Sequence, residues 1–279
     1  MTKDQLIQAL KDNDCLDLFE LYYENQHRSF YGLVEELYQL RTEHGLSTRI
    51  SPLQSEIDTL IDGKALQELP PEHLSRIQQS LDLNQRAHKM SRFILTQDNH
   101  SAFAPAVELV MFGDSITEWG PWHDALPSIK LANRGLAGDT TSGMIRRLST
   151  TKACQPKLVC VMAGINDLSQ GYSVSKVVEN YRQMLDFWSS EDIEVWVQST
   201  LYVGERIGSL NRLVAELNQE LQTLCSARGL RFIDLNATLS PQGSLPLEHS
   251  CDDLHLNSNA YNLWLDTLSP LLSSYFKTK

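Results

Sequence analysis

Residues 107–115 of this chain read VELVMFGDS, an apolar run that ends in Gly113-Asp114-Ser115. The run is short, partly β-branched and closed by a glycine, so residues 107–112 are predicted to form a buried β-strand. ITEWG follows, which places Ser115 at a strand-to-helix turn. A serine at such a turn is exposed at the end of the sheet, with its own N–H among those of the helix N-terminus.

The same alternation continues to the C-terminus. Four further short apolar runs are predicted as strands, at residues 129–132, 158–162, 193–197 and 230–233. Amphipathic helices separate them, and the clearest starts near Ile207 and ends before Gly229, a residue typical of a helix C-cap. Five buried strands with intervening helices predict a parallel sheet covered on both faces, a three-layer α/β/α sandwich. Ligands bind such sheets at the carboxyl ends of the strands.

The first 105 residues have a helical pattern instead. One apolar stripe at helical spacing consists of Phe30, Leu33, Val34 and Leu37, and another begins with Leu74, Ile77 and Leu81 after Pro70-Pro71. Ser51-Pro52 with Gln54 is typical of a helix start. We predict an all-helical region over residues 1–105 and a second domain over 106–279. The stripes fit an interaction module, through which the chain would form a homo-oligomer, or an ordinary core.

Composition narrows the class of protein. The 279 residues are 42% hydrophobic and 21% charged, as expected for a globular protein with a core, and carry a formal net charge of −11. That charge argues against a nucleic-acid partner, which needs clustered Lys and Arg. We expect no membrane span, because no apolar run approaches about 18 residues. No secretory pattern begins the sequence and the five cysteines are scattered, so we expect a cytoplasmic protein with reduced thiols.

Three further segments carry residue types that acyl transfer needs. Gly138, in NRGLAGDTT, offers a backbone N–H with no side chain in the way, and Asn166, in AGIND, offers a neutral amide donor. Both suit an oxyanion hole, as does the N–H of Ser115. Near the C-terminus, Asp252 precedes His255 by three residues, a spacing at which a carboxylate can orient an imidazole and stabilise its charged form.

Each of these segments also has an ordinary structural interpretation. Ser and Asp often cap helices, and Gly-x-Asn-Asp is typical of turns. His123 is a rival base because it follows Ser115 closely. Cys251 lies beside Asp252, but no neighbour in the sequence would lower its pKa, so we expect a buried structural thiol. The joint occurrence of the four segments, in this order, favours catalysis.

Together the segments resemble the SGNH (GDSL-type) serine hydrolase superfamily, whose four blocks supply Ser, Gly, Asn and His in this order. The likeness covers residues from about 107 to the C-terminus. GDSITE (113–118), NRG (133–135), GDTT (138–141), GINDL (164–168) and DDLHLN (252–257) are most similar to the platelet-activating-factor-acetylhydrolase-like branch. Ile116 replaces the leucine of the GDSL motif, a conservative change.

This resemblance implies a flavodoxin-like sandwich and a set of roles. Ser115 would be the nucleophile, His255 its base and Asp252 the orienting carboxylate. The oxyanion hole would consist of the Ser115 and Gly138 N–H groups and the Asn166 amide. The resemblance implies neither a metal nor an organic cofactor.

The expected substrate is a small-molecule acyl ester. The resemblance implies short acyl groups, mostly acetyl, with an O-acetylated carbohydrate as the leading candidate. A lysophospholipase or thioesterase on longer chains is the alternative enzyme, and a non-catalytic binding protein on the same fold is the alternative class. Trp119, Leu201 and Tyr202, with Trp122, follow strand ends and are candidate pocket walls, although such residues are equally typical of core packing.

Overall fold

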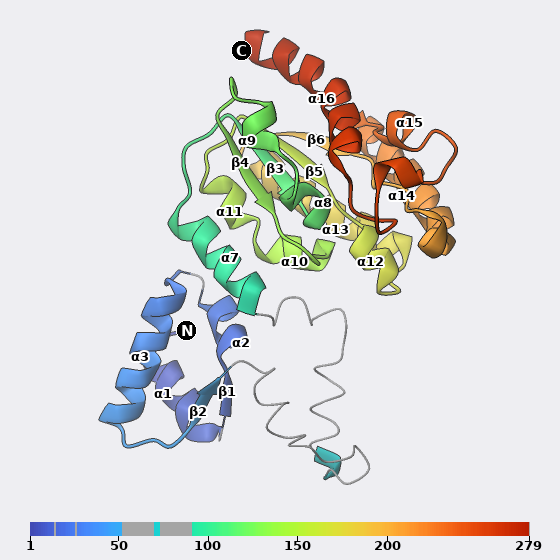
Figure 1. Ribbon diagram of the computed structural model, residues 1–279. Coiled ribbons are helices and arrows are strands. Elements are labelled where there is room, and N and C mark those ends of the chain that lie inside the picture. The colour runs from blue at the N-terminus through green and yellow to red at the C-terminus, as the bar shows by residue number, and fades with distance from the viewer. Residues whose placement is uncertain (14, 26, 52–69, 73–90, 279) are drawn as a thin grey trace. The chain divides into compact units, whose positions relative to one another are not determined.

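The computed structural model describes residues 1–13, 15–25, 27–51, 70–72 and 91–278 (Figure 1). Contacts between residues divide the chain into two compact units, Met1–Phe103 and Ala104–Lys279. This division falls two residues before the boundary proposed from the sequence. No helix among the described residues is both long and apolar enough to cross a bilayer.

The N-terminal unit contains helices and a small sheet. The helices are α1 (Lys3–Asp12), α2 (Leu18–Glu24), α3 (Phe30–Glu43) and α7 (Ser91–Ala102); strands β1 (Cys15–Asp17) and β2 (Arg49–Ser51) pair in parallel. The first predicted stripe is α3, which Ser29 caps by accepting the Gly32 N–H, and its Leu33 and Leu37 are fully buried.

The small sheet corrects the all-helical expectation for this unit. Each strand has three residues, too few to show the alternating pattern that identifies a strand in a sequence. Ser51 is the last residue of β2. The predicted start at Pro52 and the stripe from Leu74 lie outside the described residues. A role of this unit in a homo-oligomer stays a prediction.

The C-terminal unit is built on a five-stranded parallel sheet in the order β4-β3-β5-β6-β7. The strands are β3 (Leu109–Gly113), β4 (Leu131–Gly135), β5 (Leu158–Met162), β6 (Glu194–Gln198) and β7 (Arg231–Ile233). Every predicted strand is present. The chain runs from β3 to β4 on one side and then crosses to β5 on the other, so the switch point of the topology lies at the carboxyl end of β3.

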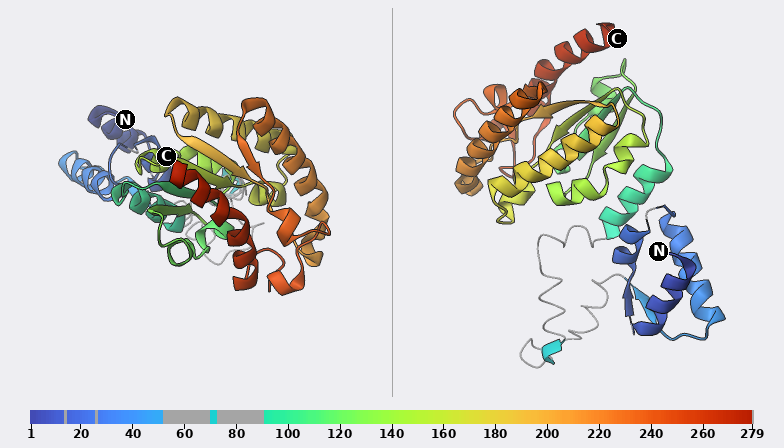
Figure 2. Two further views of the ribbon diagram at one scale, coloured as in Figure 1. Left: turned by 90° about the horizontal axis from the view of Figure 1, so that it is seen from above. Right: turned by 180° about the vertical axis from the view of Figure 1, so that it is seen from behind.

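Helices cover both faces of this sheet, which confirms the three-layer sandwich (Figure 1, Figure 2). Helices α10 (Thr141–Arg146), α13 (Val174–Ser190) and α14 (Asn211–Arg228) lie on one face and α16 (Ser258–Thr278) on the other. Trp188 of α13 packs edge-on against Phe112 of β3 with ring centroids 5.5 Å apart. Helix α14 ends at Gly229 in the left-handed conformation, the predicted cap.

Shorter elements complete the connections between the strands and the longer helices. They are α8 (Ser115–Glu118), α9 (Trp122–Ala125), α11 (Ser149–Lys152), α12 (Ile165–Ser169), η3 (Glu205–Leu210), α15 (Asn236–Leu239) and η4 (Leu247–His249). In register, Gly113 lies beside Gly135 on one side and Met162 on the other. The segments that follow β3, β4 and β5 therefore start at the same level and meet at one edge.

Candidate active site

Ser115 is the first residue of α8, directly after β3. Asp114 caps this helix by accepting the Ile116 N–H on its carboxylate at 3.0 Å. The serine is 6% exposed, and its Oγ lies 2.9 Å from Nε2 of His255. As the first helical residue, Ser115 does not use its N–H within the helix. The cap thus holds both the hydroxyl and the N–H of the serine at the strand end.

His255 lies between η4 and α16 and is held by Asp252. Its Nδ1 is 2.6 Å from Oδ2 of Asp252, while Oδ1 accepts the N–H groups of Leu254 (3.0 Å) and His255 (2.7 Å). Burial by itself raises the pKa of Asp252, but the hydrogen bonds from His255 and the two amides outweigh it and hold that pKa well below its usual range. Asp252 therefore stays ionised and can stabilise a protonated imidazole.

Gly138 and Asn166 lie together beside the nucleophile strand. Gly138 has a φ of +78°, and a Cβ built there would meet no atom within 4 Å, so its conformation rather than crowding favours glycine. Asn166 donates from Nδ2 to the carbonyl of Asp139, the next residue after Gly138, at 2.9 Å. That bond orients the amide and leaves its second N–H available. The Leu136 N–H binds the Gly113 carbonyl at 3.0 Å, which ties this turn to β3.

The four aromatic and aliphatic candidates occupy different environments. Trp119 is 51% exposed, and its ring stacks on His255 with centroids 4.0 Å apart at 33°. Tyr202 is half-buried and lines a separate cavity of about 350 Å³. Leu201 and Trp122 are buried in the hydrophobic core. The ring of Trp119 is therefore the candidate wall that lies against the Ser115–His255–Asp252 set.

The two rival residues take no part in this arrangement. His123 lies exposed on α9, while the histidine that contacts Ser115 is His255. Cys251 is exposed, which corrects the expectation of a buried thiol. Its neighbour Ser250 is 3% exposed, and the turn that buries this serine directs the next side chain outward.

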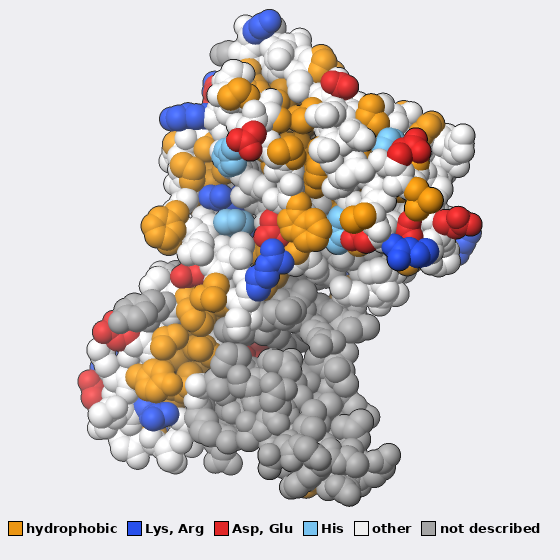
Figure 3. Space-filling view, in the orientation of Figure 1, with side chains coloured by type: hydrophobic (Ala, Val, Ile, Leu, Met, Phe, Trp, Pro, Cys, Tyr) orange, Lys and Arg blue, Asp and Glu red, His pale blue; other side chains and the backbone are white. Residues whose placement is uncertain are grey.

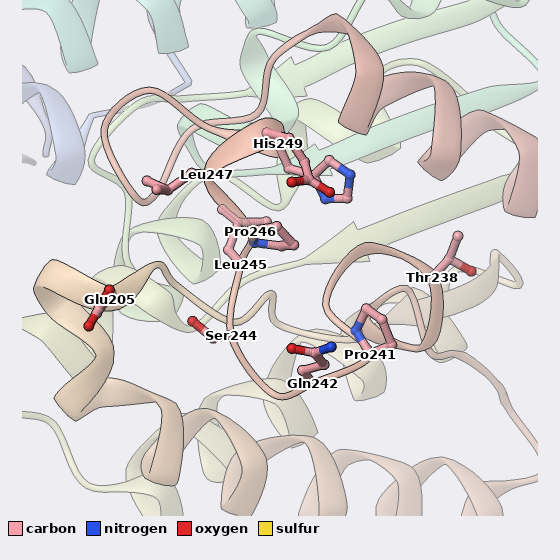
Figure 4. Close-up of a pocket in the computed structure, with 10 residues that line it drawn as sticks. Glu205, Thr238, Pro241, Gln242, Ser244, Leu245, Pro246, Leu247 and His249 are labelled. Atoms are coloured by element: carbon pink, nitrogen blue, oxygen red, sulfur yellow. The ribbon is translucent and has the colours of Figure 1, made fainter.

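A cavity beside the loop that carries His255 does not contain the catalytic candidates. It has a volume of about 660 Å³, and its walls include Glu205, Leu247 and His249 (Figure 4). Neither Ser115 nor His255 lines it. On the face shown in Figure 3, acidic, basic and histidine side chains are interspersed with hydrophobic ones. Among the described residues, no group of three or more His, Cys, Asp or Glu is placed to hold a metal ion.

A buried ionic network lies behind the serine, and sequence reasoning missed it. Arg147 and Asp139 are both fully buried and form an ion pair at 2.6 Å. Arg147 also donates to the carbonyls of Gly113 (2.8 Å) and Arg134 (2.6 Å). Asp167 accepts the N–H and hydroxyl of Thr141. Asp139 and Asp167 were visible in the motifs, but nothing in the sequence singled out Arg147, because an arginine just past a short helix is ordinary.

Two carboxyl groups beside Arg147 and Asp139, those of Asp114 and Asp167, have raised pKa values. Burial raises the pKa of Asp114 to about 7; the Ile116 N–H and Arg147 oppose this effect, while Asp139 and Asp167 add to it. Burial likewise raises the pKa of Asp167 to about 6, against the hydrogen bonds from Thr141. The region behind Ser115 therefore gains negative charge as the pH rises through the neutral range.

Replacing Asp114 with asparagine should flatten the pH dependence of stability between about pH 4 and pH 7. A carboxyl group whose folded-state pKa is raised contributes its full stability below the unfolded pKa and loses it as the pH rises through the folded one. Each pKa unit is worth about 1.4 kcal/mol, so the wild type should lose a few kcal/mol over this window and Asp114→Asn less. Urea midpoints at pH 5 and pH 8 measure the difference. Asp124→Asn, at an exposed position, is the control, and equal slopes for Asp114→Asn and wild type would contradict the prediction.

Comparisons with known proteins identify the family of this chain. The sequence model of the GDSL-like Lipase/Acylhydrolase family matches residues 111–263. Curated N-acylneuraminate cytidylyltransferases from Streptococcus agalactiae are 25% identical over 146 residues, which cover 50% of this chain and 35% of theirs. The chain thus matches about a third of the length of those relatives.

Solved structures share the fold. A GDSL-like lipase from Bacteroides thetaiotaomicron superposes with a TM-score of 0.59 at 20% identity, covering 66% of this chain and 98% of that one. A mutant of an acetyl-xylooligosaccharide esterase from Geobacillus gives 0.51 at 16% identity, with coverages of 59% and 93%. The family match spans more than half of the sequence and confirms the predicted resemblance. The chain belongs to the GDSL-like lipase/acylhydrolase family.

Proposed function

We propose that this protein hydrolyses short acyl esters through an acyl-enzyme on Ser115, with His255 as the base and Asp252 as its orienting carboxylate. The observation that carries the proposal is the hydrogen-bond chain from Ser115 Oγ to His255 Nε2 (2.9 Å) and from Nδ1 to Asp252 (2.6 Å). Nucleophile, base and orienting group within hydrogen-bond reach are what serine acyl transfer requires.

The reaction has two steps. His255 Nε2 takes the hydroxyl proton as Ser115 Oγ bonds to the ester carbonyl carbon, and the carbonyl oxygen becomes an oxyanion. When the C–O bond to the alcohol breaks, His255 gives that proton to the leaving oxygen, and the acyl group stays on Ser115. Water then attacks the acyl-enzyme, His255 takes a proton from it and returns it to Ser115 Oγ, and the acid is released.

We assign the oxyanion to the three donors named above. The N–H groups of Ser115 and Gly138 and the second amide hydrogen of Asn166 are placed on the segments that meet at the carboxyl edge of the sheet. Donors held by the fold before the reaction stabilise the charge that develops in the transition state without reorganising.

The substrate class we favour is an O-acetylated carbohydrate. Half-exposed Trp119 beside His255 offers a flat apolar surface of the kind on which the hydrophobic face of a sugar ring packs. The Geobacillus protein that shares the fold is an acetyl-xylooligosaccharide esterase, and the curated relatives are named for an N-acylneuraminate. Leu201 is buried, so we leave it out of the substrate surface; Tyr202 stays a candidate.

Chain-length profiling tests the function. Wild type and Ser115→Ala are assayed with p-nitrophenyl acetate, butyrate and octanoate, and then with an acetylated xylooligosaccharide. We expect wild-type activity to fall with chain length and the variant to be inactive. Activity that rises toward octanoate would favour the lysophospholipase or thioesterase alternative. Equal activity of the two proteins would refute a serine mechanism, and an inactive wild type would favour the binding-protein alternative.

Replacing Asn166 with alanine should lower kcat by about 10²–10³-fold, the usual effect of removing one oxyanion donor. KM should change little, because the amide is aimed at charge that exists only in the transition state. The measurement is the steady-state hydrolysis of p-nitrophenyl acetate, with the melting temperature as a check on folding. Asn262→Ala, at an exposed position of α16, is the matched control. A rise in KM at unchanged kcat would assign Asn166 to substrate binding instead.

A further inference from the structure

Asp253 lies between the two partners of the catalytic pair and has an unusual backbone. Its φ is +68°, in the left-handed region. Residues other than glycine seldom adopt this conformation, although Asp and Asn do so more readily than most. Because Asp252 accepts the N–H groups of Leu254 and His255, the chain must fold back sharply at residue 253. The contact between Asp252 and His255 therefore depends on a backbone conformation that needs support.

The support comes from the segment that follows β6. The carbonyl of Asp253 accepts the N–H of Gly204 at 2.8 Å. Its carboxylate, 3% exposed, is paired with the Nε of Arg206, whose side chain is 68% exposed. A buried carboxylate is costly unless it is paired and hydrogen-bonded. The two bonds hold Asp253 at its backbone and at its side chain.

The close contact with Asp253, and not the backbone conformation, requires a glycine at position 204. Its φ is −72°, which any residue can adopt. A Cβ built at Gly204 would lie 2.1 Å from Oδ1 of Asp253 and 2.6 Å from its Cβ. A side chain at 204 would therefore displace Asp253. The absence of one lets the two loops approach closely enough for the Gly204–Asp253 hydrogen bond and the Arg206 ion pair to form together.

We propose that Gly204 and Arg206 form a clamp on Asp253 that positions His255 against Ser115, which makes Arg206 a positioning residue for ester hydrolysis. This inference rests on the proposed function. Without the guanidinium, the buried Asp253 carboxylate would turn toward water and pull residue 253 out of its left-handed conformation. The His255 ring would then lose its alignment, and a displacement of about 1 Å can cost about 10²-fold in rate.

The first experiment compares two arginine variants. Arg206→Gln should lower kcat for p-nitrophenyl acetate at least about tenfold with KM nearly unchanged, because alignment rather than binding is lost. Arg212→Gln is the matched control: Arg212 is 81% exposed and forms a surface pair with Glu216 at 3.8 Å. It should retain wild-type kinetics. Equal kcat values for the two variants would overturn the proposal.

A second pair of variants isolates the route of the effect. Glycine adopts the left-handed conformation without cost, so Asp253→Gly removes both the buried charge and the strain. In that background Arg206→Gln should have little further effect, whereas it is harmful in the wild type. An equal loss of kcat in both backgrounds would show that Arg206 acts without Asp253 and would refute the clamp.

Two readouts separate the clamp from a general loss of structure and from the proposed function. In Arg206→Gln the acid limb of the pH profile of kcat/KM should move to lower pH, since Asp252 no longer stabilises a protonated imidazole. A loss of folded protein would leave the limb in place.

Amide hydrogen exchange over residues 251–256 needs no substrate, and it should be faster in Arg206→Gln than in Arg212→Gln. Unchanged exchange would overturn the clamp even if Ser115-dependent hydrolysis is found. Faster exchange in a protein without esterase activity would refute the function alone.

Discussion

Replacing His255 with alanine is expected to lower kcat for an acetyl ester by roughly 10⁴–10⁶-fold. A serine hydroxyl is a weak nucleophile unless a base takes its proton, and Nε2 of His255 is 2.9 Å from Ser115 Oγ. Ser115→Ala should cause a loss of similar size. The double variant should be no worse than either single variant, because the two groups act as one unit.

Steady-state kinetics with p-nitrophenyl acetate measure these losses, and melting temperatures show whether each variant folds. His123→Ala is the control, since this exposed histidine of α9 was the rival base, and it should keep wild-type activity. Asp252→Asn should retain the geometry but lose the stabilisation of the imidazolium, at a cost of up to about 10⁴-fold. An active His255→Ala variant, or an inactive and folded His123→Ala variant, would reverse the assignment of the base.

Replacing Arg147 with methionine should lower the free energy of unfolding of the C-terminal unit by about 3–5 kcal/mol. The guanidinium is fully buried, pairs with Asp139 at 2.6 Å and donates to the carbonyls of Gly113 and Arg134. It also lies over the ring of Phe112, 4.3 Å from its centroid. Its removal leaves the buried Asp139 carboxylate without its cation and takes one donor away from each of the two carbonyls, and methionine can restore only the packing.

Urea unfolding followed by tryptophan fluorescence measures this effect. All five tryptophans lie within Ala104–Lys279, so the signal reports that unit. Arg182→Met is the matched control, because Arg182 forms a pair with Glu179 at 3.7 Å in which both side chains are well exposed, and such pairs contribute about 0–1 kcal/mol. If Arg147→Met were no less stable than Arg182→Met, the network would not be a major source of stability.

Local sequence patterns predicted the frame of the C-terminal unit because its determinants are local. Buried parallel strands need continuous apolar runs, and each of the five runs is a strand. Gly229 ends α14 in the left-handed conformation, and this requirement involves only the residue itself and its neighbours in the sequence. The order of the motifs predicted that Ser115, Gly138 and Asn166 would meet, because strands in one parallel sheet bring their carboxyl ends to the same edge.

Other features depend on residues that are distant in the sequence. Arg147 matters because the fold buries it beside Asp139 and the end of β3, and Arg206 matters because it reaches Asp253, 47 residues later. Leu201 lies in the core although its strand-end position suggested a pocket wall. Cys251 is exposed because the turn buries the preceding residue, Ser250, instead.

By itself, then, the sequence determined the sandwich and the order of the four motifs, and it predicted which residues would supply the nucleophile, the base and the oxyanion donors. Apolar periodicity and turn conformation depend only on residues that are close together in the sequence. Only the tertiary structure decided which charges are buried, which aromatic ring lies against His255 and what supports the left-handed turn at Asp253. Those properties are set by partners far along the chain, and burial, which controls both the cost of a charge and its pKa, exists only once the chain has folded.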